Sequence, residues 1–364
     1  MRILVTVPWA QRLGGAETML QTVLAGARER GQDLEFVFFE PGPWAQELAG
    51  DGFHVEVIRT GRLREAHRWA LSVVRLARVL RRRNPDLILN WAAKTQLYGS
   101  PAAVLAGMRG RVVWWQQMIP TGGWVDRCAT MLPAVAIACY SQAAADAQAR
   151  LAPGRRTLVI PAGAPPPGAG SATVALDLPS DRPIVGLVGR LQRWKGQDRL
   201  LRAQAVLRER GYEVHVLIVG GDAYGLEPGY AESLPRLVEQ LGLAGAVTMT
   251  GQVPDAGPYI ERMDILVNAS DPEPFGIVLL EGMARGAAVV AVDSGGPAEF
   301  ILDGETGVLA GSGEPGALAD AIEPLLLSSE RRQAIARAGR ESYLRDFTDE
   351  AMRKRFFDEM QRVL

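Results

Sequence analysis

The sequence contains few residues that cross-link a chain or bind a metal ion. Its 364 residues include two cysteines, Cys128 and Cys139, and three scattered histidines. Two cysteines cannot form a disulfide framework or a four-ligand zinc site. A reducing, cytoplasmic setting is therefore expected.

Long hydrophobic runs and an excess of one charge are also missing. No segment approaches the roughly 18 to 20 consecutive apolar residues that cross a bilayer, and Met1–Pro8 enters an apolar strand without a cleavage site, so we expect no secretory signal. A formal net charge of -1 gives no general attraction for nucleic acid. With 48% hydrophobic and 22% charged residues, the composition is that of a soluble, folded protein whose length predicts two domains.

Short apolar runs rich in valine and isoleucine alternate with helical stretches along the whole chain. Their hydrophobicity is continuous rather than alternating, which is typical of parallel strands covered on both faces by helices. The segment 163–182, with Pro165–Gly170 inside it, interrupts this rhythm and is expected to link two domains. The sequence therefore predicts an α/β fold with two doubly wound, Rossmann-like domains facing across a cleft. The expected strands are 3–7, 35–39, 55–58, 87–89, 112–115, 135–139, 158–160, 184–188, 214–219, 247–249, 265–267 and 289–292.

In each half of the chain, one glycine-containing turn follows the first strand. In Leu13–Thr18, Gly14 and Gly15 could bring backbone amides close to a phosphate or sugar, although any tight strand-to-helix turn needs glycine. In Gly189–Asp198, Arg190 and Lys195 are cations at a strand end, where they could bind a leaving diphosphate; the alternative is solvated surface charge.

The segment Pro272–Met283 carries the strongest chemical signal. Glu273 and Glu281, with seven residues between them, lie on either side of a predicted helix start, and Pro274 is expected in the first helical turn. Gly276 would let a ligand approach backbone amides that bind anions, and the two carboxylates could hold sugar or ribose hydroxyls. The alternative is one dipole-stabilising acid and one solvated acid. Asp293–Glu299 repeats the strand and glycine-turn pattern.

Together these four motifs, in this order, closely resemble the family-4 retaining glycosyltransferases of the two-Rossmann-domain (GT-B) type. The resemblance spans nearly the whole chain. It implies an acceptor-binding domain at 1–165, a nucleotide-sugar donor domain at 166–346, and a last helix, 347–364, that returns to the first domain. It also implies catalytic roles for Glu273, Arg190 and Lys195, and donor binding by Gly14, Gly15, Gly189, Phe275, Gly276, Ile277 and Glu281.

The chain departs from the family pattern after its fifth strand, where members often carry a histidine near the reacting carbon. Gln116 or Gln117 would occupy that place, and glutamine can donate a hydrogen bond but cannot titrate. Asn90 and Trp91, at the end of the fourth strand, stand where polar first-domain residues often lie. These four residues are the candidates on the acceptor side.

The resemblance implies front-face transfer of a hexose with retention, in which the departing phosphate takes the acceptor proton. No Asp-x-Asp metal pattern is present, so we expect neither metal nor cofactor, with cations in their place. The expected donor is a nucleotide diphosphate sugar, UDP-linked in preference to GDP-linked. The acceptor would be a small molecule, glycan or lipid-linked compound in glycan, glycolipid, polysaccharide or secondary-metabolite biosynthesis.

Three alternatives remain: a sugar-nucleotide-binding protein without turnover, and an epimerase or phosphorylase on the same scaffold. The scarcity of histidine disfavours an epimerase, and the lack of a Gly-x-Gly-x-x-Gly fingerprint disfavours a hydride-transferring enzyme. The arginine-rich segment Arg62–Arg83 could bind anionic lipid on the inner face of the membrane. Its simpler interpretation is a core-packed helix with a basic exposed face.

Overall fold

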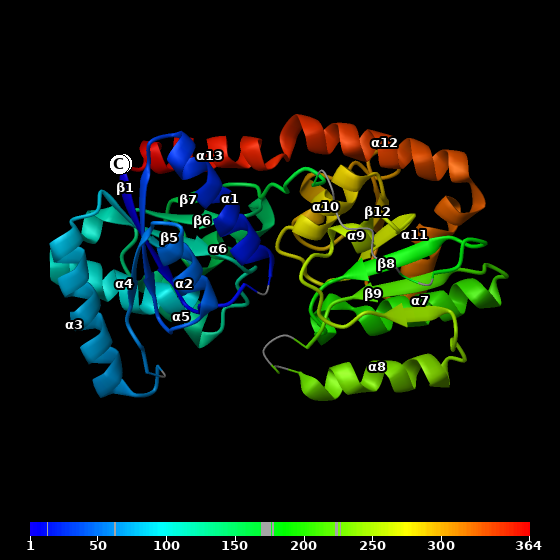
Figure 1. Cartoon of the computed structure of the whole chain (residues 1–364), viewed down its shortest axis with the longest axis horizontal. Coiled ribbons are helices and arrows are strands. Elements are labelled where there is room, and N and C mark those ends of the chain that lie inside the picture. The colour runs from blue at the N-terminus through cyan, green and yellow to red at the C-terminus, as the bar shows by residue number, and fades with distance from the viewer. Residues whose placement is uncertain (13, 62, 169–175, 177, 223–224, 226) are drawn as a thin grey trace. The chain divides into compact units, whose positions relative to one another are not determined.

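The computed structural model describes all residues except 13, 62, 169–175, 177, 223–224 and 226, and it divides into two compact units (Figure 1). Unit 1 comprises Met1–Pro161 and Met352–Leu364, and unit 2 comprises Ala162–Ala351. Part of the predicted linker lies outside the described residues. Ala164, which precedes that part, is held within unit 2: its amide donates to Phe347 (3.1 Å) and its carbonyl accepts from Asp349 (3.0 Å).

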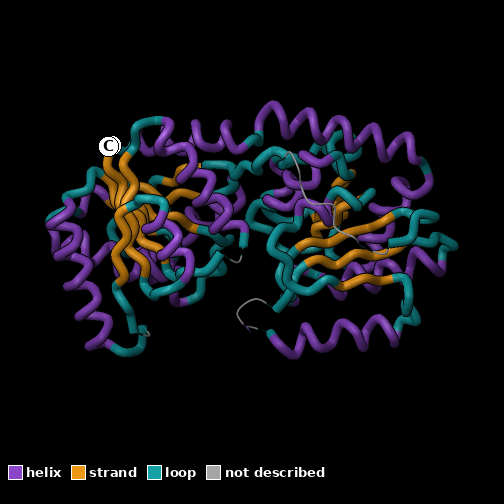
Figure 2. The backbone as a smooth tube through the Cα atoms, viewed as in Figure 1, coloured by secondary structure: helices purple, strands orange, loops and turns teal. Residues whose placement is uncertain are grey.

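Unit 1 is built on a seven-stranded parallel sheet with the strand order β3-β2-β1-β4-β5-β6-β7. Figure 2 shows its strands flanked by helices. The strands are β1 Arg2–Val7, β2 Asp33–Phe38, β3 His54–Val57, β4 Leu87–Asn90, β5 Val112–Gln116, β6 Ala136–Cys139 and β7 Thr157–Val159. The helices are α1 Gly15–Glu29, α2 Pro43–Gly50, α3 Ala66–Arg83, α4 Ala93–Ala106, α5 Trp124–Met131, α6 Gln142–Leu151 and most of α13 Asp349–Arg362, with a 3-10 turn, η1, at Arg109–Arg111.

Unit 2 is built on a six-stranded parallel sheet with the order β10-β9-β8-β11-β12-β13. Its strands are β8 Ile184–Val188, β9 His215–Val219, β10 Val247–Met249, β11 Ile265–Asn268, β12 Ala288–Val292 and β13 Val308–Ala310. Its helices are α7 Gln197–Glu209, α8 Pro228–Gln240, α9 Gly257–Ile260, α10 Ile277–Arg285, α11 Pro315–Leu327 and α12 Ser329–Asp346, with 3-10 turns η2 Arg193–Lys195 and η4 Pro297–Glu299.

The predicted fold class is confirmed. The central strands are buried along their length, as in β12, where all five residues are covered. This explains why their sequences are continuously apolar: helices cover both faces of each sheet. One strand, β13, was not predicted.

Each sheet has a point where the chain order reverses. In unit 1 it lies between β1 and β4, and in unit 2 between β8 and β11. At such a point the loops after the two strands run in opposite directions and leave a crevice at the carboxyl ends, where doubly wound folds bind ligands. The motif residues of both units are found at these strand ends.

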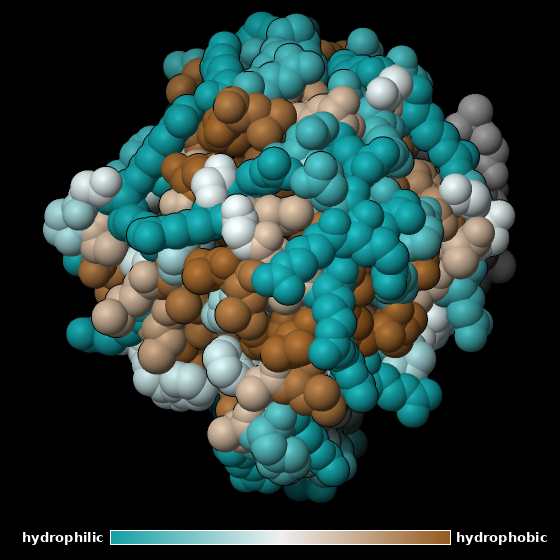
Figure 3. All heavy atoms as spheres, turned by 90° about the vertical axis from the view of Figure 1, so that its left-hand side faces the viewer, coloured by the Kyte–Doolittle hydropathy of each residue, from teal (hydrophilic) through white to brown (hydrophobic). Residues whose placement is uncertain are grey.

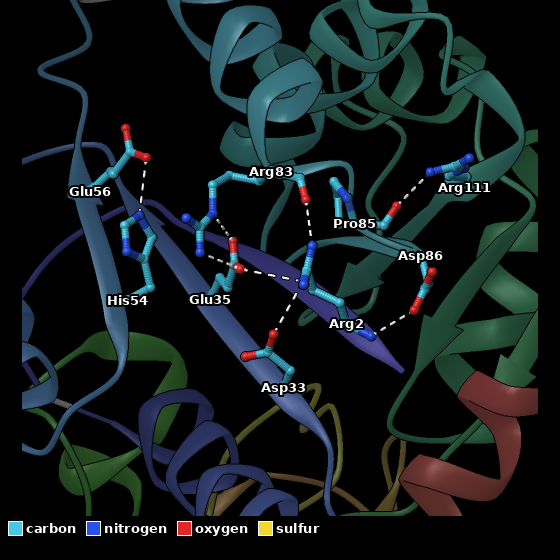
Figure 4. Close-up of polar contacts among 9 residues, drawn as sticks. All are labelled: Arg2, Asp33, Glu35, His54, Glu56, Arg83, Pro85, Asp86 and Arg111. Carbon is cyan, nitrogen blue, oxygen red and sulfur yellow. Dashed lines mark hydrogen bonds and ion pairs between the residues drawn. The ribbon is translucent and has the colours of Figure 1, made fainter.

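The opposite, amino-terminal edge of the unit 1 sheet is fastened by ion pairs (Figure 4). Glu35 of β2 is buried, and its carboxylate accepts two hydrogen bonds from Arg83 at the end of α3 (2.6 and 2.5 Å). Arg2 of β1 lies 3.6 Å from Glu35 and 3.1 Å from Asp33. A buried carboxylate needs such cations. This network anchors α3 to the sheet at the edge opposite the carboxyl ends of the strands.

Candidate active site

The site in unit 2 is formed by the loops that follow β8, β11 and β12, three neighbouring strands. Arg199 ties the first two loops together, because its guanidinium donates to the carbonyls of Trp194 (2.9 Å) and Ala269. The amide of Asp271 also donates to Trp194 (3.0 Å). The loop after β8 is therefore fixed against the loop after β11, although their residues are far apart in the sequence.

A lysine and a glutamate from these loops form the centre of the site. The Lys195 ammonium lies 2.8 Å from Oε2 of Glu273, which is 6% exposed. Asn268, the last residue of β11, donates its Nδ2 to the same oxygen (3.1 Å), while its Oδ1 accepts from the amide of Ser270 (2.9 Å). Lys195 also lies 3.9 Å from the centre of the Trp194 ring. The lysine is thus oriented by a carboxylate and an aromatic face.

The carboxylate of Glu273 is held ionised. Burial by itself would raise its pKa, but the charge and hydrogen bond of Lys195, with hydrogen bonds from Ser270 and Asn268, hold the pKa below its ordinary value. An ionised, paired carboxylate is a poor proton donor or acceptor near neutral pH. Its chemistry is instead to orient a cation and accept hydrogen bonds.

The backbone beside Glu273 is closely packed. Its amide donates to Ser294 (3.0 Å), and its carbonyl accepts from Gly296 (2.9 Å), so the loops after β11 and β12 pair like short strands. Gly276 caps α10 with φ 97°, a conformation that favours glycine. The prediction that Pro274 lies in the first helical turn is wrong, because α10 begins at Ile277, after this left-handed residue.

Phe275, Gly276 and Ile277 form the turn into α10. The Phe275 ring is buried and contacts Phe300, with 5.1 Å between ring centres, which fixes the peptide that precedes Gly276. Among the described residues, no hydrogen-bond acceptor is recorded for the amides of Gly276 and Ile277. Such amides at a helix start are donors suited to an anion.

Glu281 lies in α10 and is half-buried. Burial, opposed by the charge of Arg285 and assisted by that of Asp255, raises its pKa to about 7. We expected Glu273 and Glu281 to hold sugar or ribose hydroxyls, and these roles stay predictions. The recorded contacts join Glu273 to Lys195, and among the described residues none is recorded for the carboxylate of Glu281.

Arg190 and Gly189 follow β8, on the same side of the sheet as Lys195. Arg190 is half-buried, and its carbonyl accepts from the Gln197 side chain (2.8 Å). The Gly189 carbonyl packs so closely on Gly220 that a Cβ at Gly220 would lie 2.1 Å from it. The loop that carries Arg190 is therefore fixed, while its contact with a ligand stays a prediction.

In unit 1, Gly14 and Gly15 stand at the start of α1, after β1. Glu17 of α1 is buried, and its Oε1 accepts a hydrogen bond from the indole of Trp9 (2.6 Å). A Cβ at Gly14 would lie 3.3 Å from the other oxygen of Glu17. A side chain at Gly14 would therefore need only a small shift of this carboxylate, and a role for Gly14 and Gly15 in donor binding stays a prediction.

The four acceptor-side candidates are mostly covered. Asn90 is fully buried: its amide oxygen accepts from Thr6 (2.8 Å) and its nitrogen donates to Gln96 (2.8 Å). Trp91 is stacked on Trp115, with 4.9 Å between ring centres. Both are core residues in this structure, which gives no support for direct contact with an acceptor.

Gln116 and Gln117 differ from each other. Gln116 ends β5 and is 3% exposed, and its Nε2 has no hydrogen-bond partner among the described residues. Gln117 is half-buried and donates its side chain to the carbonyl of Trp91. An unsatisfied buried amide is costly, so Gln116 is the better of the two candidates for binding a ligand.

Comparison with known proteins adds the family. Residues 173–342 match the family "Glycosyl transferases group 1". A lipopolysaccharide core biosynthesis glycosyltransferase, LpsE of Rhizobium meliloti (strain 1021), is 27% identical over 349 residues, 93% of each chain. A GDP-mannose-dependent alpha-(1-6)-phosphatidylinositol monomannoside mannosyltransferase of Mycolicibacterium smegmatis (strain ATCC 700084 / mc(2)155) is 35% identical over 169 residues, 44% of this chain and 43% of that protein.

The fold also has a counterpart among solved structures. The crystal structure of Anabaena Alr3699/HepE in complex with UDP and glucose superposes with a TM-score of 0.82, at 24% identity, over 99% of both chains. The match to the group 1 glycosyl transferases covers most of unit 2, and the similarity to the LpsE glycosyltransferase extends over nearly the whole chain, in agreement with the resemblance seen in the motifs. The solved structure shows that the fold with two Rossmann-like units is shared.

The described residues contain no group of three or more His, Cys, Asp or Glu side chains placed to hold a metal ion. Over the same part of the chain, no helix combines the length and the apolarity needed to span a bilayer. Metal-independent transfer stays a prediction.

Proposed function

We propose that the protein transfers a hexose from a nucleotide diphosphate sugar to an acceptor hydroxyl, with retention and without a metal ion. The observation that carries this proposal is the Lys195–Glu273 pair at the switch point of unit 2, beside the amides that open α10. A fixed cation and backbone donors are what a departing diphosphate requires.

The residues divide into three tasks. Lys195 has three donors, so it can bind a phosphate oxygen while it keeps its bond to Glu273. Arg190 supplies a second cation, and Glu281 accepts the ribose hydroxyls. The acceptor proton goes to the departing phosphate oxygen, so the protein positions reactants and stabilises charge without a nucleophile of its own.

The alternatives predict different chemistry. An epimerase would need a titratable acid and base that converge on the sugar. In this site Glu273 is held ionised by Lys195, so it cannot serve as the acid. Glu281 is then the one titratable carboxylate of the pair, and no second acid or base is recorded in contact with it within the described chain. A binding protein without turnover would use the same site, so only a measurement of sugar transfer or donor hydrolysis separates it from an enzyme.

The donor can be identified by thermal stabilisation. HepE was crystallised with UDP and with UDP-glucose, whereas the mycobacterial relative is named for GDP-mannose. We expect UDP-sugars to raise the melting temperature more than GDP-sugars, with about 2.7 kcal/mol of stabilisation at 100 times the dissociation constant. If no nucleotide sugar or nucleoside diphosphate changes the melting temperature, the proposed donor site is wrong. Tight binding without transfer or hydrolysis would instead favour the binding protein.

Nucleotide affinity should depend on pH near neutrality. Because the pKa of Glu281 in the free protein is about 7, its carboxylate becomes ionised as the pH rises through that value. An ionised carboxylate accepts hydroxyl hydrogen bonds more strongly. Isothermal titration with the preferred nucleotide sugar, whose esterified diphosphate does not titrate in this range, should therefore show affinity increasing from pH 6 to pH 8, and Glu281→Gln should flatten the curve. An unchanged pH profile in that variant would exclude Glu281 as the ribose ligand.

The outer face of α3 supports a peripheral membrane contact. The stripe Val73, Leu76 and Leu80 packs into the core, as the simpler interpretation predicted. Leu71 and Val74, however, are 47% and 37% exposed; Val74 directly precedes the exposed Arg75, and Leu71 lies about one helical turn before it. Figure 3 shows apolar side chains exposed between long hydrophilic ones on this face of unit 1. Exposed aliphatic groups beside arginines suit an anionic bilayer surface.

Vesicle flotation tests this contact. We expect the protein to float with phosphatidylglycerol vesicles at low salt, to be released at high salt, and to stay unbound on neutral vesicles. Arg75→Glu combined with Arg78→Glu should abolish flotation, because both side chains are exposed and no ion pair is recorded for either within the described chain. Matched replacement of Arg331 and Arg337, on exposed positions of α12, is the control. Salt-independent flotation, or none, would remove the proposal.

A further inference from the structure

A pocket of about 510 Å³ lies within unit 1, apart from the residues discussed above. It is lined by Thr60, Gly61, Leu63, Glu65, Arg68 and Lys94. The lining comes from the loop after β3 and from the first turns of α3 and α4. Its volume is in the range of small-ligand pockets. Because all strands of the sheet are parallel, this pocket lies at the same carboxyl edge as Gly14 and Gln116.

Lys94 is the chemically unusual residue of this pocket. It is half-buried, and no carboxylate of the described chain is recorded within ion-pair distance of its amine. Burial lowers its pKa, while the more distant charge of Glu40 partly restores it. A half-buried amine that forms no ion pair loses hydration, and the distant carboxylate offsets this loss only in part. No contact recorded within the described chain supplies the rest.

The helix ends add to the positive potential. Lys94 is in the first turn of α4, and Arg68 is in the first turn of α3; neither turn contains an acid. A cation there is unfavourable, because the amino end of a helix is itself positive. Arg68 is neutralised by Glu65, with 3.3 Å between them, whereas Lys94 has no such pair. The pocket therefore has an excess of positive charge that an anion would balance.

We infer that this pocket binds an oxyanion group, a phosphate or a carboxylate, of the sugar acceptor, with Lys94 as its counter-ion. The inference rests on the proposed transferase function for the identity of the ligand as the acceptor. The hydroxyl of Thr60 and the aliphatic Leu63 complete a lining suited to a substituted sugar or polyol rather than to a bare ion. Lys94 thus becomes a specificity residue that separates charged from neutral acceptors.

The low number of lysines makes a direct test feasible. The chain has three: Lys94 in the pocket, Lys195 in the donor site and Lys354 in α13, where it pairs with Asp358 (2.7 Å). Reductive ¹³C-methylation of the full chain gives one NMR signal for each lysine, and Lys195→Met and Lys354→Met assign them. Inorganic phosphate and sodium acetate are then titrated separately into the protein saturated with UDP.

We expect phosphate or acetate to shift the Lys94 signal saturably while the Lys354 signal stays in place. The stronger of the two anions indicates a phosphorylated or a carboxylated acceptor. Failure of both anions to move the Lys94 signal, up to concentrations that begin to move Lys354, would overturn the inference. The NMR signal of Lys195 reports on the donor site separately. If UDP shifts the Lys195 signal and neither anion shifts the Lys94 signal, the proposed function stands and this inference fails. If UDP leaves Lys195 unmoved and an anion moves Lys94, the anion pocket stands and the proposed donor site fails.

Discussion

Replacing Lys195 with methionine should lower the turnover of the donor sugar by roughly 10²- to 10³-fold. Methionine keeps the aliphatic length of the side chain but removes the ammonium group, which lies 2.8 Å from Glu273 and 3.9 Å from the centre of the Trp194 ring and is proposed to receive the diphosphate. The loss should appear in kcat rather than in KM alone, because charge on the diphosphate grows as the sugar departs. Single-turnover hydrolysis of the preferred nucleotide sugar measures this step without an acceptor.

The same variant should change how stability depends on pH. Because the pKa of Glu273 is lowered in the native protein, the pair stabilises the fold above the ordinary pKa of glutamate, and this stability is lost as the pH falls through the lowered value. Without Lys195 the carboxylate is buried with hydrogen bonds but without a cation, and breaking such a pair costs about 3–5 kcal/mol. Denaturant unfolding near neutral pH should show most of this difference, and the difference should shrink in acid.

Lys354→Met provides the control for both measurements. Lys354 forms an exposed ion pair with Asp358, and exposed pairs contribute about 0–1 kcal/mol. Its turnover and stability should stay close to those of the unmodified protein. Turnover of Lys195→Met within a few-fold of this control would show that Lys195 does not stabilise the departing diphosphate.

The fold could be predicted because its main signal is local. Continuous valine and isoleucine runs such as Val289–Val292 mark strands covered on both faces, and glycine turns mark their carboxyl ends. The missed strand, β13, has three residues and lies between Gly307 and Gly311, so it carries too little apolar pattern to be distinguished from a loop. The start of α10 was misplaced because proline is common in first helical turns, whereas here the left-handed Gly276 separates Pro274 from the helix.

The central contact of the site could not be predicted, because it is tertiary. Lys195 and Glu273 are 78 residues apart, and only the adjacency of β8 and β11 brings them together. Asn268 was overlooked, although an asparagine that ends the buried run Ile265–Asn268 indicates a side chain that forms hydrogen bonds at a strand end. The loop sequence around Glu273 marked the segment but gave no indication that Lys195 is its contact partner.

In unit 1 the strand ends were identified, but the direction of their side chains was not. Asn90 ends a buried strand and Trp91 follows it, as ligand-binding residues often do, yet Asn90 bonds to Thr6 and Trp91 stacks on Trp115. The side chain of a polar or aromatic residue at a strand end can pack in the core or point into the crevice, and the sequence pattern does not distinguish these two orientations. Lys94, a few residues further on, was not singled out, because its covered position depends on the packing of α4 beside the loop after β3.

Gly296→Ala should disable the site from a position that touches no substrate in the proposed mechanism. Gly296 has φ −69° and ψ −30°, which alanine adopts without strain, so any effect comes from the added methyl group. That methyl would lie 2.5 Å from both the Cα of Phe275 and the carbonyl oxygen of Pro274. Both atoms belong to the backbone, so the segment between Glu273 and Gly276 must move.

The expected cost of this overpacking is about 1–3 kcal/mol in the free energy of unfolding. Its effect on catalysis should be larger, because a displacement of about 1 Å in a positioning group can lower the rate about 10²-fold. Urea unfolding and kcat/KM for the donor measure the two effects. Gly316→Ala is the matched control: Gly316 lies in α11, the added methyl would meet no atom within 4 Å beyond the local backbone of that helix, and alanine there should leave turnover unchanged. If Gly296→Ala matches that control in turnover, the close packing of the loops after β11 and β12 does not position Glu273 for catalysis.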